Sequence, residues 1–240
     1  MNSQKPEARA KGDGSTLDLH SIFFTIQGEG PFAGHRSIFV RLAGCNLQCP
    51  GCDTEYTEGR REVEVQALMQ EIANVATDAG VLVHRMLIVI TGGEPLRQPI
   101  GHLVSELVAR GNRVQIESNG VFAPDERLNR ALCYDDNVTL VVSPKTKRIH
   151  ADTDLLASCF KYVLDAGSVD PDDGLPIMAL EHPASTGVAR PSDRTRPIYL
   201  NPYDAKDEAR NAENLRAVAT SCMKHGYIAG VQMHKLIGLE

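Results

Sequence analysis

Short apolar runs rich in β-branched residues alternate with stretches of helical spacing along most of this 240-residue sequence. A short apolar run bounded by turn residues is typical of a buried strand. Eight such runs predict strands at residues 21–26, 37–44, 86–91, 113–118, 138–143, 159–165, 196–201 and 229–234. Because strands that alternate with helices form β-α units, the pattern predicts the α/β class with a mainly parallel sheet.

Three longer stretches have the spacing of amphipathic helices. They lie at residues 62–80, 99–111 and 204–226. In the first stretch, Gly80 supplies a stop signal at the end of the helical pattern. The residues expected to share the buried face of this helix are Val65, Leu68, Met69, Ile72 and Val75 or Ala76.

The length and composition fit a single domain with an ordinary core. Apolar residues make up 42% of the chain and charged residues 23%, as is usual for a globular protein. Residues 1–17 are polar and predict a disordered N-terminal tail, so the expected domain spans residues 18–240. Within it, residues 166–195 are rich in Pro, Gly, Asp and Ser, which predicts an irregular loop.

Charge and hydropathy make several kinds of partner unexpected. The formal net charge of −6 gives no reason to expect binding to nucleic acid or to a membrane surface. No apolar run approaches the ~20 residues that span a bilayer, and the N-terminus lacks the apolar region of a secretory signal. We therefore expect a cytoplasmic protein, whose six cysteines indicate metal binding or catalysis instead of disulfides.

Unusual polar and glycine-rich segments stand where the predicted strands end. They read QGEG, then a cysteine-rich loop, then TGGEP, ESNG, SPK and NPYD in chain order. In α/β barrels and open α/β sheets, ligands bind beyond the carboxyl ends of the strands. The recurrence of these segments at successive strand ends therefore predicts one shared pocket.

Three of the six cysteines, Cys45, Cys49 and Cys52, form a C-x3-C-x2-C pattern directly after a predicted strand. A [4Fe–4S] cluster ordinarily takes four thiolates, so three leave one iron open to a ligand that the protein does not supply. A zinc site would need a fourth donor from elsewhere, such as His35 or Cys133. The isolated Cys133, Cys159 and Cys222 are expected to be buried core thiols.

The cysteine spacing, together with VITGGEP at residues 89–95, resembles the radical S-adenosylmethionine superfamily. The resemblance implies a [4Fe–4S] cluster whose open iron binds S-adenosylmethionine, which is then cleaved to a hydrogen-abstracting 5′-deoxyadenosyl radical. It also implies a partial, open α/β barrel. Gly92 and Gly93 would let backbone carbonyls approach the amino group of the methionine, because no Cβ stands in the way.

Within that superfamily, residues 25–56 resemble the 7-carboxy-7-deazaguanine synthase family. The similarity returns in VITGGEP, QIESNG, VVSPK and the terminal QMHK, so it covers most of residues 19–235. The implied reaction contracts the ring of 6-carboxy-5,6,7,8-tetrahydropterin and releases ammonia to give 7-carboxy-7-deazaguanine. That product serves queuosine and other 7-deazapurine pathways, in which tRNA or DNA is modified.

The resemblance assigns site residues position by position. The implied pterin contacts are Ile26, Gln27, Gly28, Arg41, Thr91 and His234. The implied S-adenosylmethionine contacts are Gly51, Cys52, Asp53, Gly92, Gly93, Glu117, Ser118, Ser143, Pro144, Lys145 and Asn201. Arg41 could hold a carboxylate through the two arms of its guanidinium. Asn201 departs from the family, in which many relatives have QP at this segment.

Further partners follow from the same resemblance. Thr54 matches a Mg²⁺ contact, and the ion would need further oxygens from substrate and water. In such a site Mg²⁺ would orient the substrate. The family also implies a homodimer and an electron donor such as flavodoxin.

Two other readings fit part of the sequence. A glycyl-radical-enzyme activase would keep the cysteines and GGEP, but it has no evident use for QGEG, Arg41 or the terminal QMHK. A non-catalytic zinc-binding module would explain the cysteines alone and would leave the other strand-end segments unexplained. The nature of the molecule that accepts the radical separates the first alternative from the pterin enzyme.

Overall fold

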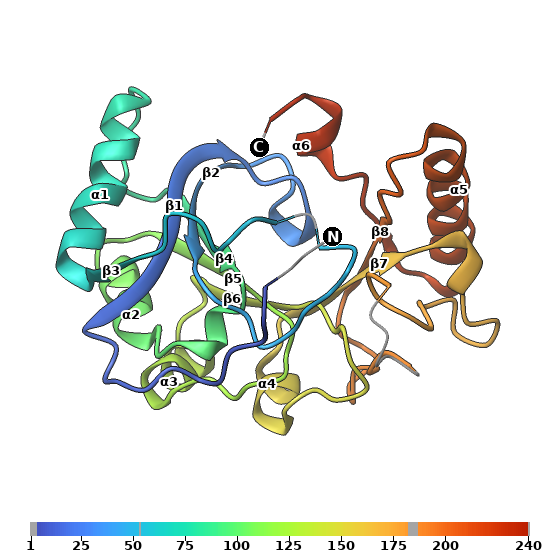
Figure 1. Ribbon diagram of the computed structural model, residues 1–240, viewed down its shortest axis with the longest axis horizontal. Coiled ribbons are helices and arrows are strands. Elements are labelled where there is room, and N and C mark those ends of the chain that lie inside the picture. Colours follow the sequence, from blue (N-terminus) through green and yellow to red (C-terminus); the bar gives the residue numbers. More distant parts are fainter. Residues whose placement is uncertain (1–3, 53, 182–186, 240) are drawn as a thin grey trace.

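The computed structural model describes residues 4–52, 54–181 and 187–239, which build one nine-stranded sheet in the order β3-β1-β2-β4-β5-β6-β7-β8-β9 (Figure 1). The strands are β1 Thr16–Ile26, β2 Arg36–Leu42, β3 Arg61–Glu64, β4 Leu87–Gly92, β5 Arg113–Ser118, β6 Val138–Val142, β7 Cys159–Leu164, β8 Ile198–Pro202 and β9 Ile228–Ala229. β1 pairs antiparallel with β2 and β3, and every other pair is parallel. The prediction of a mainly parallel, open α/β sheet is therefore confirmed.

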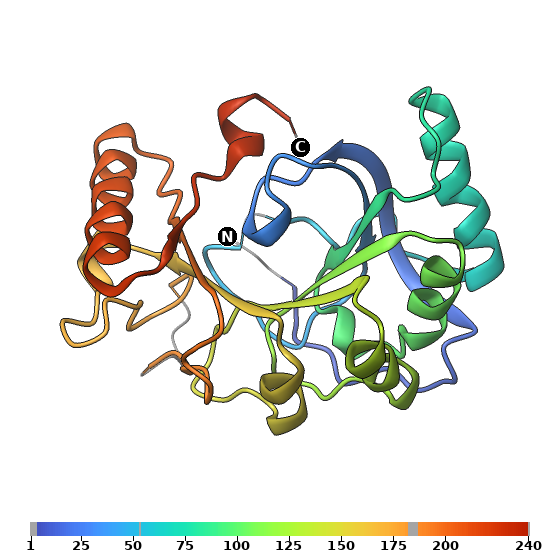
Figure 2. The same cartoon turned by 180° about the vertical axis from the view of Figure 1, so that it is seen from behind.

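Helices lie around the outside of the curved sheet, and the last short helix lies beside its opening (Figures 1 and 2). They are α1 Val65–Asp78, α2 Gly101–Ala109, α3 Glu126–Tyr134, α4 Ala151–Leu156, α5 Glu208–His225 and α6 Met233–Leu236. Three 3₁₀ turns accompany them, at η1 Gly30–Phe32, η2 Pro95–Arg97 and η3 Ala166–Ser168. None of the helices in the described residues is long and apolar enough to cross a membrane.

The hydrophobic core lies between the outer face of the sheet and these helices. Alternate residues of each strand enter it, such as Val40 in β2 and Ile88 in β4, where they meet Leu68 and Ile72 of α1. Side chains of successive strand residues point to opposite faces. The residues between the core positions are therefore left on the inner face, where the site is built.

The first predicted helix is confirmed with the expected buried face, although it begins later. α1 buries Val65, Leu68, Met69, Ile72 and Ala76. Residues 61–64, which include the start of the predicted helix, instead form β3 on the edge beside β1. Helices α3 and α4 were not expected. α3 buries only Leu128, so an apolar stripe hardly marks it, and it begins where Asp125 accepts a hydrogen bond from the Leu128 amide.

The C-terminus corrects the prediction of a strand at residues 229–234. β9 ends at Ala229, and His234 lies in the short helix α6. The chain turns at Gln232, whose φ of 48° is left-handed and incompatible with a strand. The Met233 amide then donates to the Gly28 carbonyl at 3.0 Å, which holds this turn against the QGEG loop.

The N-terminal segment also differs from the expected tail through residue 17. β1 already begins at Thr16, and Leu17 is buried in the core. Residues 4–15 have no helix or strand, but the Glu7 amide donates to the Cys45 carbonyl and the Ala10 amide to the Arg97 carbonyl. Between residues 166 and 195, the described part contains η3 and one bridge that joins Val169 to Pro176.

Candidate active site

The inner face of the sheet is polar near the carboxyl ends of the parallel strands. Register places Arg41 beside Thr91 and Glu117 beside Val141, which pairs in turn with Cys159. The polar positions that alternate with core residues are Arg41, Thr91, Gln115, Glu117, Ser143, Lys161 and Asn201. The sheet thus brings five predicted residues, from β2, β4, β5, the end of β6 and β8, to one face together with two that were not predicted, Gln115 and Lys161.

The cysteine loop, residues 43–60, joins β2 to β3 and carries three thiols that fit an iron–sulfur cluster. Cys45 and Cys49 are buried and Cys52 is half-buried. Burial raises the pKa of Cys45 to about 12 and that of Cys49 to about 11, so bound iron must supply the positive charge that stabilises thiolates there. Within the described residues, no three His, Cys, Asp or Glu side chains converge as they do around a single ion. A cluster suits the loop because each thiolate binds its own iron.

The proposed zinc ligands and core thiols can now be placed. Cys133 is exposed on α3, so the expectation of a buried thiol is wrong there, because α3 buries only one residue. Cys159 and Cys222 are buried as expected. His35 Nδ1 lies 3.1 Å from the Phe32 carbonyl, in the loop after η1. Among the described residues of the cysteine loop, none has a recorded contact with Cys133 or His35.

The two glycines of TGGEP allow the end of β4 to pass against the start of the cysteine loop. A Cβ on Gly92, whose φ is 122°, would lie 2.1 Å from the Leu42 carbonyl oxygen, and one on Gly93 would lie 2.0 Å from that of Gly44. The Gly93 amide donates to the Leu42 carbonyl and the Glu94 amide to that of Gly44. The glycines therefore serve backbone packing here, which the sequence analysis did not foresee.

Glu94, the fourth residue of the same motif, ties three strand ends together. It is 1% exposed, and burial raises the pKa of its carboxyl group above the usual range. Its oxygens accept hydrogen bonds from the Ser118 hydroxyl at 2.7 Å and the Asn119 amide at 2.7 Å. The Asn119 side chain then donates to Asn46, beside Cys45, at 2.8 Å. The hydroxyl of Ser118, expected at the cofactor, is thus engaged by Glu94 on the side away from the inner face.

A buried lysine that the sequence analysis missed lies between two carboxylates on the inner face. Lys161 Nζ lies 2.5 Å from Glu29 Oε2 and 3.2 Å from Glu117 Oε2. Gln232 donates to the other oxygen of Glu29 at 2.7 Å, and Gln27 donates to Glu117 at 3.0 Å. We call these five residues the Lys161 network. It joins β5 and β7 to the QGEG loop and to the C-terminal turn.

The Lys161 network shifts the pKa values of Glu29 and Lys161 in the directions that keep both groups ionised. Burial by itself raises the pKa of Glu29, but the Lys161 ammonium and the Gln232 amide outweigh it and hold that pKa at about 2. Burial likewise opposes the charge of Lys161, and the two carboxylates outweigh it and raise the pKa of Lys161 above its usual value. The sequence signal for this lysine was weak, since a single Lys inside an apolar strand can also mark an exposed edge.

Four of the predicted pterin residues, Ile26, Gln27, Gly28 and His234, lie in this network or directly beside it. A Cβ on Gly28 would lie 1.9 Å from His234 Nδ1, so the QGEG loop and α6 are in contact. The Arg41 guanidinium lies 4.9 Å from the centre of the Phe23 ring, as in a cation–π contact. Ile26 is the last residue of β1, next to Gln27. Glu117, expected at the cofactor, is bonded to Gln27 and so also belongs with this group.

Further cofactor candidates lie at the ends of β6 and β8. Lys145 follows Ser143 and Pro144 and donates to the Ser143 hydroxyl at 2.5 Å. Burial lowers the pKa of Lys145. Asn201 is fully buried, and neither atom of its amide has a hydrogen-bond partner among the described residues. A Cβ on Gly230 would lie 1.7 Å from Asn201 Oδ1.

Three further candidates belong to the cysteine loop. The Gly51 amide donates to the Leu180 carbonyl at 3.1 Å, and a Cβ on Gly51 would lie 2.8 Å from the Tyr203 hydroxyl. Thr54 is half-buried, and its carbonyl oxygen lies 3.7 Å from Cys52 Sγ. Asp53 lies outside the described residues.

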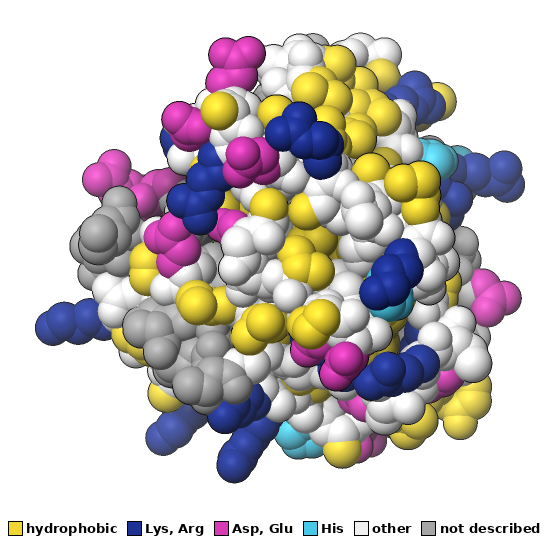
Figure 3. All heavy atoms as spheres, turned by 90° about the vertical axis from the view of Figure 1, so that its right-hand side faces the viewer, with side chains coloured by type: hydrophobic (Ala, Val, Ile, Leu, Met, Phe, Trp, Pro, Cys, Tyr) yellow, Lys and Arg dark blue, Asp and Glu magenta, His cyan; other side chains and the backbone are white. Residues whose placement is uncertain are grey.

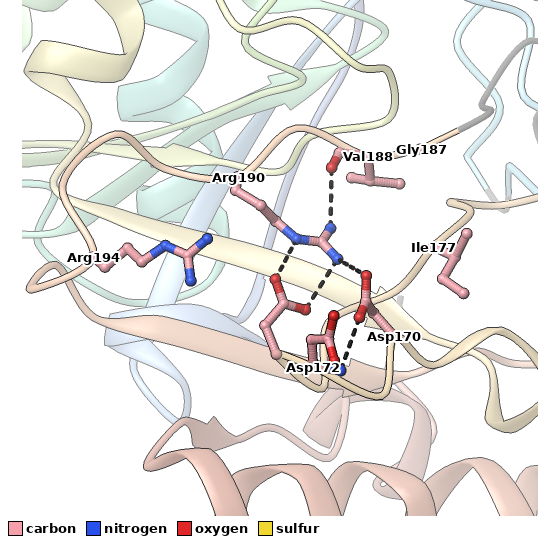
Figure 4. Close-up of a pocket in the computed structure, with 8 residues that line it drawn as sticks. Asp170, Asp172, Ile177, Gly187, Val188, Arg190 and Arg194 are labelled. Carbon is pink, nitrogen blue, oxygen red and sulfur yellow. Dashed lines mark hydrogen bonds and ion pairs between the residues drawn. The ribbon is translucent and has the colours of Figure 1, made fainter.

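Two cavities lie on the β7–β8 side of the molecule. The larger one, of about 440 Å³, lies within residues 170–194, where Arg190 is held by carboxylates that include Asp170 (Figure 4). It is not the strand-end site. The smaller one, of about 210 Å³, is lined by Val163, Leu180 and Tyr203 among others, and therefore adjoins Gly51.

Comparison with known proteins shows what the chain is similar to. Residues 40–146 match the Radical SAM superfamily. The chain is 39% identical over 232 residues to the 7-carboxy-7-deazaguanine synthase of Rhodospirillum rubrum, with 94% of each chain covered. It is 34% identical over 234 residues to that of Rickettsia prowazekii, covering 95% of this chain and 91% of the relative. The crystal structure of QueE from Escherichia coli has the same fold, with a TM-score of 0.65 over 91% of this chain and 95% of that chain, at 21% identity.

Proposed function

The chain belongs to the 7-carboxy-7-deazaguanine synthase family of radical S-adenosylmethionine enzymes, and from this premise we propose that it converts 6-carboxy-5,6,7,8-tetrahydropterin to 7-carboxy-7-deazaguanine. The observation that carries the proposal is the position of the three thiols, on a loop that follows β2 at the same carboxyl ends of the parallel strands where the polar residues of the inner face lie. Such a surface suits a polar, carboxylated small molecule better than a polypeptide chain. A glycyl-radical activase and a zinc module are therefore not favoured.

In this proposal, Cys45, Cys49 and Cys52 hold the [4Fe–4S] cluster. Together with S-adenosylmethionine, the cluster would supply the radical chemistry that removes a hydrogen from the substrate. The residues proposed to bind S-adenosylmethionine are Gly51, Cys52, Asp53, Gly92, Gly93, Glu117, Ser143, Pro144, Lys145 and Asn201, whereas the hydroxyl of Ser118 is bonded to Glu94. The amide of Asn201 supports its place in this set, because a buried amide without a partner costs free energy unless a ligand completes it.

The chain's own groups would bind and orient the pterin. Arg41 and His234 supply donors for its carboxylate, and Gln27 and Thr91 supply hydrogen-bonding groups beside them. Ile26 and Gly28 place Gln27 at the end of β1. The contact between Gly28 and α6 supports this arrangement, since it lets the C-terminal turn close over the inner face and exclude water.

The proposed Mg²⁺ would be held by Thr54 and completed by oxygens of the substrate and water. The position of Thr54 next to Cys52 supports the proposal that this ion would orient the substrate. The expected dependence of turnover on Mg²⁺ can be measured by titrating the metal into chelator-treated enzyme. Activity that is unchanged without Mg²⁺ would remove this ion from the proposal.

The remaining expectations concern partners and location. We expect a homodimer, an electron donor such as flavodoxin, and a place in cytoplasmic queuosine or other 7-deazapurine synthesis. Apolar side chains are visible near the upper edge of the face in Figure 3, and Leu236, Ile237 and Leu239 of the C-terminal segment are exposed. These residues support a subunit contact. Sedimentation of Leu236→Glu against the unchanged chain would test it.

The deciding experiment is an anaerobic assay of the reconstituted enzyme. It contains S-adenosylmethionine, a reductant, Mg²⁺ and the carboxytetrahydropterin, and mass spectrometry reads the products. We expect 7-carboxy-7-deazaguanine, lost in Cys49→Ala. Formation of 5′-deoxyadenosine without that product would keep the radical chemistry and reject the substrate. If an assembled cluster gave neither, the radical mechanism would be rejected as well.

A further inference from the structure

Four charged side chains join the N-terminal segment to both ends of the cysteine loop. Arg60 Nη1 lies 2.8 Å from Glu7 Oε1, and Arg60 Nη2 lies 2.5 Å from Asp18 Oδ2. Arg97 lies 3.2 Å from each of the same two carboxylates. We call Glu7, Asp18, Arg60 and Arg97 the loop clamp. No sequence motif pointed to these residues, which come from four separate segments.

One side of the loop clamp holds the start of the cysteine loop. Arg97, with a side chain only 4% exposed, donates to the Ala43 carbonyl at 3.1 Å. The Glu7 amide donates to the Cys45 carbonyl at 2.7 Å. A Cβ on Gly44, whose φ is 82°, would lie 2.6 Å from the Arg97 guanidinium, so the backbone passes directly over that group. The carbonyl groups of the two residues next to Gly44, Ala43 and Cys45, are thus held by clamp residues.

The other side holds the end of the same loop. Arg60 is the residue before β3, which the sheet order places two strands away from β2. The loop must therefore cross β1, and Asp18 of β1 is one of the two carboxylates that both arginines share. Arg97 belongs to η2, directly after the TGGEP motif. The loop clamp consequently fixes the two ends of the cysteine loop against each other and against the end of β4.

We infer that the loop clamp is a positioning device for the iron–sulfur cluster. The cysteine loop has little regular structure of its own, so its thiols lose conformational freedom when they bind iron. Closing the loop by ion pairs lowers that cost before the cluster is present. Isolated surface ion pairs contribute little, but here a buried arginine, two shared carboxylates and two backbone carbonyls act together. The inference rests on cluster binding by the three cysteines.

Two neighbouring arginines provide a matched test. Arg60 belongs to the loop clamp, whereas the next residue, Arg61, pairs with Glu71 of α1. After anaerobic reconstitution of full-length Arg60→Gln and Arg61→Gln, the iron content and the decay of cluster absorbance with chelator are measured. We expect Arg60→Gln to lose its cluster about five- to tenfold faster than the unchanged protein, and Arg61→Gln to lose it at the same rate. Equal rates in the two variants would overturn the inference.

A second measurement separates positioning from folding. Thermal unfolding of the iron-free variants should give similar midpoints for Arg60→Gln and Arg61→Gln, since the ion pairs that each variant loses are partly exposed and contribute little to stability. Glu7→Gln should speed cluster loss as well, and combining it with Arg60→Gln should add less than the sum of the two effects. Full additivity would contradict a shared clamp. If Cys49→Ala retained as much iron as the unchanged chain, the cluster assignment itself would fail.

Discussion

The loop clamp and the Lys161 network both join distant segments through charged side chains. They differ in the number of cations for each carboxylate and in the part of the molecule where they lie. The clamp has two arginines for two carboxylates and holds backbone groups behind the cysteine loop. The Lys161 network has one lysine for two carboxylates and lies on the inner face. Loss of one clamp residue therefore leaves another partner in place, whereas loss of Lys161 leaves two carboxylates unpaired at once.

The difference suggests separate duties for the two networks. Weakening the clamp should affect retention of the cluster and leave the inner face unchanged. Weakening the Lys161 network should disturb Glu29 and Glu117, and with them Gln27, while the cysteine loop stays in place. Iron content and turnover should thus respond independently to substitutions in the two regions. Three substitutions around the Lys161 network test this separation.

The largest effect is expected from Lys161→Met. Removing one partner of a buried ion pair costs about 3–5 kcal/mol, because a charge stays buried without compensation. Here two carboxylates lose their cation, so turnover should fall about a hundredfold or more, with iron content unchanged. Urea unfolding of the iron-free protein and steady-state kinetics measure the two effects. Lys161→Arg, which keeps the charge, should recover part of the activity through a lower KM. Normal kinetics in Lys161→Met would contradict a role of the Lys161 network in turnover.

A smaller effect is expected from Gly28→Ala, which alters the contact over the network without changing charge. The new Cβ would lie 1.9 Å from His234 Nδ1, so the C-terminal turn must move. Overpacking of this kind costs about 1–3 kcal/mol, and we expect KM for the pterin to rise about tenfold. Gly167→Ala is the control, since its Cβ would come no closer than 3.4 Å to Asp165. Equal KM values in both variants would separate α6 from the substrate site.

The smallest effect concerns acid stability and Glu29. Its pKa in the folded protein is about 2, against an ordinary value of 4.5. A lowered pKa stabilises the folded state above the ordinary value, and that contribution is lost as the pH falls from 4.5 towards 2. Glu29→Gln should therefore be less stable than the unchanged chain at neutral pH, yet lose less stability across this interval. Urea unfolding midpoints of the iron-free proteins at several pH values measure this difference. Glu126→Gln is the control, because the side chain of Glu126 is 90% exposed. If the stability of Glu29→Gln and of the unchanged chain fell in parallel with pH, the ion pair between Glu29 and Lys161 would be contradicted.

Local sequence patterns anticipated much of the fold. The apolar runs at the positions of β2, β4, β5, β6, β7 and β8 are strands, and the face of α1 is the expected one. Such patterns work because burial on a sheet or helix repeats at short intervals. They failed for the last strand, where a hydrogen bond from Met233 to Gly28 and the left-handed Gln232 redirect the chain. They also missed α3, which has too little apolar surface to mark it.

The sequence by itself indicated the iron–sulfur chemistry of the cysteine loop, because its three cysteines lie within a few positions of one another. It also indicated the α/β class, because the patterns of strands and helices are local as well. Only the tertiary structure decided that Lys161 meets Glu29 from 132 positions away, and that Gln232 meets the same carboxylate from 203 positions away. It also decided that Glu7 reaches the cysteine loop. Such pairs depend on strand order and loop closure, which bring together residues that no local pattern connects.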